Sequence, residues 1–170
     1  WLLYFFIQDE VIDASLDRYR GYLLPLGNLF FLDALAPYRS LFGSASPFWT
    51  FLEQYTAEWA ESVSWEREQH WGQAREFEQG DLLHLARKSA PLKIPCAALS
   101  LLAGRQEVIR PLEEMVDNVM VFFQLTDDLR DWREDLAQGY YSYFLMRVIA
   151  DRGRRSPAML TEVEVEKALF

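Results

Sequence analysis

The sequence has little cysteine and no long hydrophobic run. Cys96 is the single cysteine among 170 residues, so no disulfide can form within the chain, and nothing indicates an oxidising compartment. The apolar run 1–7 is much shorter than the roughly 20 residues that span a bilayer. No basic segment precedes that run, as one would in a signal peptide. We therefore expect a cytoplasmic protein without a transmembrane segment, and Trp1 in place of Met indicates a piece of a longer chain.

Basic residues are scarce as well. The chain has 17 Lys and Arg against 26 Asp and Glu, a formal net charge of −9. Proteins that bind nucleic acids neutralise the phosphates of the nucleic acid with clustered Lys and Arg, so we expect no nucleic-acid partner. The acidic balance does not exclude a phosphorylated ligand held through metal ions. With 51% hydrophobic residues, the chain is expected to form one domain over 1–170 with a sizeable core.

β-branched residues are sparse, whereas Leu, Ala, Glu, Gln and Arg dominate the long segments between glycines and prolines. This composition, with apolar residues three and four positions apart, predicts an all-α protein. Gly and Pro positions divide it into expected helices at 1–19, 26–42, 47–79, 81–103, 106–138, 141–152 and 160–169. Asp81 is the expected N-cap of the fourth helix, and His70 is expected on the surface of the third.

Aromatic and aliphatic residues fall on one face of the expected helix 47–79. Such a stripe is typical of core packing, and the alternative is that some of its rings line a ligand cavity, where ring faces attract cations. The spacing alone leaves both interpretations open. The stripe consists of Phe48, Phe51, Leu52, Tyr55, Trp59 and Val63.

Acidic residues crowd one face of the expected helix 106–138. Within an arc of about 120° at 100° per residue, this face carries Gln124, Asp127, Asp128, Asp131, Glu134 and Asp135. Like charges four residues apart destabilise a helix, so the crowding favours a bound cation, with a solvated acidic surface as the alternative. Oxygen ligands are typical of Mg²⁺ or Mn²⁺ sites.

A second acidic cluster, Asp9, Glu10, Asp13 and Asp17, has nearly the same layout near the start of the chain. Arg18 and Arg20 follow it at the end of the same expected helix. Two helices that present acids toward a shared cavity could hold several Mg²⁺ ions between them. Basic residues at the rim could then bind a polyanion.

Both clusters resemble motifs of the class I isoprenoid synthases, which include the trans-prenyl diphosphate synthases and the squalene/phytoene synthases. Residues 9–21, DEVIDASLDRYRG, resemble the first aspartate-rich motif DDxxDxxxxRRG, with Glu10 at its second acidic position. Residues 123–131, FQLTDDLRD, resemble the second motif, FQxxDDxxD. The longer string 124–143 is similar to the phytoene/squalene synthase string QLTNxxRDxxEDxxxGRxY.

The resemblance implies an antiparallel helical bundle around a central cavity, here without the N-terminal helices. It also implies ionisation of an allylic prenyl diphosphate, with diphosphate release followed by prenyl transfer, head-to-head condensation or terpene cyclisation. The implied cofactor is a group of three Mg²⁺ ions, with Mn²⁺ as a substitute. A homodimer is the implied assembly.

The family's functional residues carry over to matching positions of this chain. The implied metal ligands are Asp9, Asp13, Asp127, Asp128, Asp131 and Asp135. The implied catalytic residues are Asp9, Asp13, Asp127, Asp131 and Gln124, the last of these near the allylic cation. The implied diphosphate-binding residues are Arg18, Arg20 and Lys88. The implied cavity wall consists of Tyr4, Phe5 and Phe6.

Two other function classes remain open at this point. One is an all-α Mg²⁺-dependent pyrophosphohydrolase, which would use Glu113, Glu114 and Asp117. The other is a non-catalytic helical protein that binds a lipid. A ferritin-like carboxylate site is disfavoured because neither His70 nor His84 has a Glu three residues before it.

Overall fold

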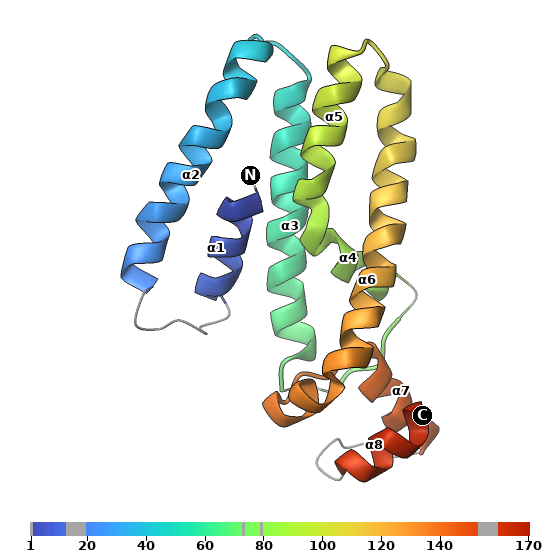
Figure 1. Cartoon of the computed structure of the whole chain (residues 1–170). Helices are drawn as coiled ribbons and strands as arrows, with labels where there is room; N and C mark the ends of the chain where they lie inside the picture. Colours follow the sequence, from blue (N-terminus) through green and yellow to red (C-terminus); the bar gives the residue numbers. More distant parts are fainter. Residues whose placement is uncertain (1, 13–19, 73, 79, 153–159) are drawn as a thin grey trace. The chain divides into compact units, whose positions relative to one another are not determined.

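The structure is a computed structural model that describes residues 2–12, 20–72, 74–78, 80–152 and 160–170. Every regular element in these residues is a helix, and the one β-type contact among them is an isolated bridge between Trp71 and Tyr140. The predicted all-α class is therefore confirmed (Figure 1). Among the helices of the described ranges, none combines the length and the apolar character needed to cross a membrane.

The chain gathers into two compact units. The first comprises Trp1–Thr56 and Pro91–Ile109, and the second comprises Ala57–Ala90 and Arg110–Phe170. Helix α3, Phe48–His70, contributes its first residues to the first unit and the remainder to the second. The expectation of one domain over 1–170 stays a prediction.

The first unit contains α1 (Leu2–Ile12), α2 (Arg20–Leu41) and α5 (Lys93–Leu102). Helices α1 and α2 lie side by side (Figure 1). The core contains a stack of rings, in which Phe48 lies 4.3 Å from Phe42 and 4.7 Å from Tyr38 between ring centroids. Five residues of the predicted aromatic stripe are buried, which supports the core-packing interpretation: Phe48, Leu52, Tyr55, Trp59 and Val63.

Helix α2 begins earlier than the sequence predicted. The predicted start at residue 26 was wrong, because the helix begins at Arg20 and includes Pro25, Gly27 and Pro37. A proline inside a helix removes one hydrogen bond and crowds the preceding turn, but packing of a helix face outweighs such local costs. Gly27 shows this packing: a Cβ there would lie 2.9 Å from the Gln8 amide nitrogen and 3.2 Å from Ile7 Cγ2.

Two predicted long helices are interrupted. The segment 47–79 is helical only to His70, because Gly72 adopts a φ of +70° and its N–H donates to the Gly139 carbonyl at 2.9 Å. The segment 81–103 divides into α4 (Asp81–Ala86), a 3₁₀ helix (Arg87–Leu92) and α5. Pro91 lies in the 3₁₀ helix and has no N–H with which to continue an α-helical ladder.

The predicted cap of α4 was wrong. Gly80, with a φ of 108°, occupies the N-cap position, and the Asp81 carboxylate instead accepts a hydrogen bond from the Glu78 N–H at 2.7 Å. A glycine takes this left-handed conformation without steric cost, so the turn needs no side-chain cap.

The second unit contains α4, nearly all of α6 (Ile109–Gln138), α7 (Tyr143–Asp151) and α8 (Glu162–Leu169). Its core includes Trp132 of α6, Leu145 and Val148 of α7 and Val165 of α8. Thr161 and Glu164 form a capping box at the start of α8. The last three predicted helices are thus present, with ends that differ by a few residues.

The close approach of α1 and α2 at Gly27 gives a testable prediction. Gly27→Val places branched methyl groups where a Cβ alone already crowds Ile7, so we expect it to destabilise the protein by about 1–3 kcal/mol. Urea unfolding followed by circular dichroism measures this change. Gly21→Val is the matched control, since nothing lies within 4 Å of a Cβ there. An equal loss of stability at both positions would contradict the assigned contact.

Candidate functional site

The acidic face of α6 carries the most informative candidate residues. Gln124, Asp127, Asp128, Asp131 and Asp135 lie on one uninterrupted helix, as the sequence predicted. Their environments differ sharply. Asp128 is 3% exposed, Asp135 is half-buried, and Asp127 and Asp131 are exposed. The face therefore includes both water-accessible and desolvated carboxylates.

Asp128 is held by two hydrogen bonds. Its Oδ1 accepts from Nε2 of Gln124 at 2.7 Å, one turn earlier on α6, and its Oδ2 accepts from the Tyr143 N–H at 3.4 Å. The second bond ties α6 to the first residue of α7. Burial raises the pKa of Asp128 to about 6, against the opposing effect of these hydrogen bonds.

Asp135 lies two turns further along α6. Burial, with the neighbouring negative charge of Asp128, raises the pKa of Asp135 to about 7. A carboxyl group with that pKa is about half protonated at neutral pH. Asp128 and Asp135 thus hold protons at pH values at which exposed aspartates have lost them.

Glu66 of α3 forms a buried network beside this face. Its side chain accepts a hydrogen bond from the Tyr140 hydroxyl at 2.8 Å and pairs with the Lys88 ammonium at 2.6 Å. Glu66 and Tyr140 are 8% and 7% exposed. The charges of Glu66 and Lys88 act on the pKa of Asp128 in opposite directions, with Glu66 raising it and Lys88 lowering it. The network and the acidic face therefore form one electrostatic system.

Sequence reasoning singled out Lys88 but missed Glu66 and Tyr140. The signal for Glu66 was present, since it follows Trp59 and Val63 at helical spacing on the stripe that proved to be buried. An acidic residue on an apolar stripe needs a buried partner. For Tyr140, no local pattern indicated that its hydroxyl would reach α3.

The surface position predicted for His70 was wrong. The His70 side chain is 0% exposed, its ring stacks on Phe77 at 4.3 Å, and the Trp65 ring lies at 5.0 Å. Neither ring nitrogen has a hydrogen-bond partner in the described part of the chain. Burial lowers the pKa of His70, which keeps its ring neutral. The reason for the error is that Phe77 folds back over α3 after the helix ends.

The first acidic cluster is described only in part. Asp13 and Arg18 lie outside the described residues, while the backbones of Asp9 and Arg20 lie in α1 and at the start of α2. Glu10 is exposed. The predicted role of this cluster in metal and diphosphate binding stays a prediction.

The three residues predicted as a cavity wall lie in different places. Phe5 is buried, and the Tyr4 ring packs 4.9 Å from both Phe5 and Phe31 of α2. Phe6 is 64% exposed. Tyr4 therefore contributes to the contact between α1 and α2, and Phe5 belongs to the buried core.

The geometry for metal binding is incomplete in the described residues. They contain no group of three or more His, Cys, Asp or Glu side chains arranged to hold a metal ion. Asp127 and Asp131, one helical turn apart and exposed, can turn toward a cation without leaving a buried hydrogen bond. To bind a cation, Asp128 would have to give up its hydrogen bonds to Gln124 and to the Tyr143 backbone.

Comparisons with known proteins give no assignment: no family model, no curated protein and no solved structure matches this chain.

The raised pKa of Asp135 predicts a pH dependence of stability. Between the unfolded value of about 3.8 and the folded value of about 7, the native state binds more protons, so stability falls as pH rises through this window. Asp135→Asn should raise the melting temperature at pH 8 and flatten its decline between pH 4 and 8, with the remaining slope due largely to Asp128. Calorimetry across this range tests it. Glu134→Gln, at an exposed neighbour, should keep the wild-type slope.

The hydrogen bond between Tyr140 and Glu66 predicts a loss of stability on its removal. Tyr140→Phe leaves a buried carboxylate oxygen without its hydroxyl donor, which we expect to cost about 1–3 kcal/mol. Chemical unfolding of this variant beside Tyr141→Phe, a less buried neighbour, measures the difference. Equal stabilities of the two variants would show that the bond contributes nothing.

Proposed function

We propose that this protein is a Mg²⁺-dependent isoprenoid synthase, which ionises an allylic prenyl diphosphate, releases diphosphate and forms a new carbon–carbon bond. One observation carries the proposal. Lys88, which the resemblance assigns to the diphosphate, pairs with Glu66 at 2.6 Å, and its charge lowers the pKa of Asp128 in the second aspartate-rich motif. Two segments that the resemblance assigns to one reaction therefore lie close enough for their charges to interact.

The raised pKa values support a cation site on α6. Carboxyl groups that hold protons near neutral pH lose them when a divalent cation arrives, because the cation stabilises the charged form. Asp127 and Asp131 supply exposed oxygens one turn apart, and Asp128 and Asp135 supply further oxygens once deprotonated. Bound Mg²⁺ supplies Lewis-acid stabilisation of the departing diphosphate.

The remaining roles follow the resemblance. Asp9 and Asp13 complete the metal ligands, and Arg18 and Arg20 assist Lys88 in binding the diphosphate. The Gln124 amide, which now donates to Asp128, orients that carboxylate and lies near the position assigned to the allylic cation. A bundle around a central cavity keeps water from that cation.

The proposal predicts the effect of removing one exposed ligand. Asp127→Ala should lower Mg²⁺-dependent release of diphosphate from farnesyl or geranylgeranyl diphosphate by about 100-fold or more, because charge stabilisation of the leaving group is lost. Phosphate-coupled assays after added pyrophosphatase measure the release, and mass spectrometry of the organic products, with and without isopentenyl diphosphate, identifies the reaction type.

Glu114→Ala is the matched control, since Glu114 is an exposed acid on the same helix that pairs with Arg110 at 3.3 Å. It should retain wild-type release. Unchanged release in Asp127→Ala would refute the proposal. If Glu114→Ala instead abolished pyrophosphate release from nucleotides, the pyrophosphohydrolase alternative would hold.

A further inference from the structure

The first unit contains an apolar pocket outside the acidic face of α6. The pocket has a volume of about 520 Å³ and lies against α1, α2 and the segment that leads into α5. Its apolar walls include Leu2, Leu3, Phe30, Tyr38, Pro91 and Leu92. Pockets of a few hundred cubic ångströms with predominantly apolar walls are the usual sites for small organic ligands.

One wall of the pocket is part of the rigid core. The Tyr38 ring stacks on Phe48, which is fully buried, with an angle of 12° between the ring planes. Phe42 stacks on the same Phe48 ring. Close-packed rings of this kind do not collapse into an adjacent space, so this side of the pocket is formed before a ligand arrives.

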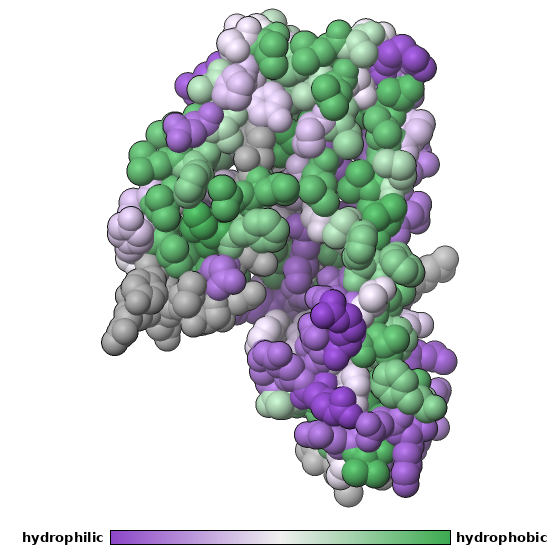
Figure 2. Space-filling model, viewed as in Figure 1, coloured by the Kyte–Doolittle hydropathy of each residue, from purple (hydrophilic) through white to green (hydrophobic). Residues whose placement is uncertain are grey.

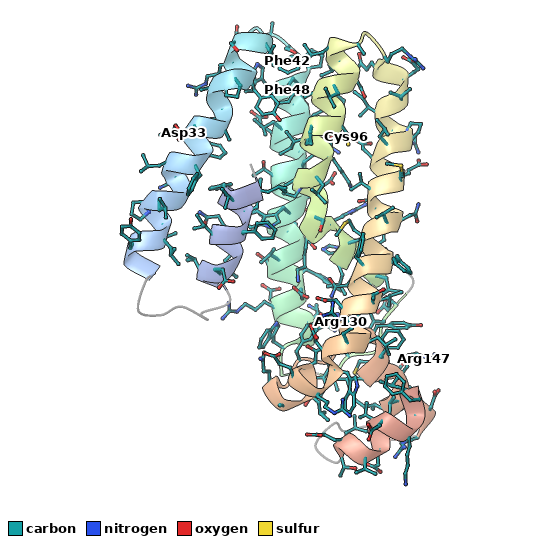
Figure 3. All side chains as sticks on the ribbon, viewed as in Figure 1. Asp33, Phe42, Phe48, Cys96, Arg130 and Arg147 are labelled. Atoms are coloured by element: carbon teal, nitrogen blue, oxygen red, sulfur yellow. The ribbon has the colours of Figure 1, made fainter. Side chains whose placement is uncertain are left out.

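Asp33 is the single charged residue among the described residues that line the pocket. Figure 3 labels it on α2. Asp33 is exposed, and it has no ion-pair or hydrogen-bond partner among the described residues. The lining residues that the structure describes include no Lys, Arg or His to balance its charge. A ligand with a positive charge is therefore attracted, and a carboxylate or phosphate is repelled.

The rings strengthen this preference. Faces of Phe and Tyr rings attract organic cations, and Phe30 and Tyr38 both line the pocket. Around it, residues 21–32 of α2 contain no charged side chain, and apolar residues cover much of the surface of α1 and α2 seen in Figure 2. A neutral apolar molecule would leave Asp33 without a partner, whereas a cation with an apolar body satisfies both features.

We propose that this pocket binds a small organic monocation with an apolar body, of the alkylammonium class. The ammonium group pairs with the Asp33 carboxylate, and the hydrocarbon body lies against Phe30, Tyr38 and Leu92. The site uses no residue of α6, so it does not depend on the proposed synthase activity.

Three ligands of equal chain length test the proposal: octylammonium, octanol and octanoate. Isothermal titration calorimetry on the whole chain should give octylammonium up to about 5-fold tighter binding than octanol and should give octanoate the weakest binding, because one exposed ion pair contributes up to about 1 kcal/mol. Asp33→Asn should reduce the octylammonium affinity to that of octanol while leaving octanol unchanged. Asp151→Asn, an exposed acid on α7, should alter none of the three.

Equal binding of octylammonium and octanoate would overturn the proposal, as would an Asp33→Asn variant with wild-type affinity for octylammonium. Failure of all three ligands to bind would also overturn it. Leu92→Trp, which fills the pocket without removing the carboxylate, should weaken octylammonium and octanol alike. Circular dichroism of each variant confirms that it is folded.

Discussion

The buried charge of Glu66 is the constraint on which the second unit depends. A desolvated carboxylate is costly unless it is paired and hydrogen-bonded, so its partners must be fixed in place. These partners come from two other segments: Lys88 lies in the 3₁₀ helix after α4, and Tyr140 lies in the turn between α6 and α7. One side chain of α3 thereby fixes the positions of both segments.

The same constraint shapes the acidic face of α6. Asp128 lies within the field of Glu66 and Lys88, and its bonds to Gln124 and the Tyr143 backbone anchor the start of α7. Burial and the negative charge of Asp128 both raise the pKa of Asp135. At Asp135, a neutral amide would avoid the cost of burying a negative charge, whereas at Asp128 both carboxylate oxygens are needed to accept hydrogen bonds. Two carboxyl groups with raised pKa values on one helix face are typical of functional sites, which supports the proposal of a cation site there.

Helical periodicity was enough to predict the all-α class and most helices, because apolar spacing reports directly on burial. It failed where packing opposed local preference. At Pro25, packing of α1 against α2 keeps the chain helical through a residue that normally ends a helix. After His70, Gly72 and the bridge from Trp71 to Tyr140 end a helix whose composition would have continued it. The packing of α1 on α2 and the bridge from Trp71 to Tyr140 are not local and leave no periodic signal, whereas Gly72 itself was a local signal for the end of the helix.

The candidate site, like the fold, could be predicted from the sequence only in part. The acidic face of α6 could be placed from spacing alone, because all its members lie on one helix. The partners of the buried Glu66 could not be predicted from spacing, because its network joins residues from three segments of the chain. Spacing also could not distinguish core rings from cavity rings. The stripe residue Phe48 is buried core, whereas Tyr38 of α2, which lies outside the stripe and stacks on Phe48, forms a pocket wall. Because the Tyr38 ring belongs to the core and also lines the pocket, a substitution there would change the stability of the protein together with its affinity for the proposed ligand. A substitution at the exposed Asp33 would change the affinity without disturbing the core.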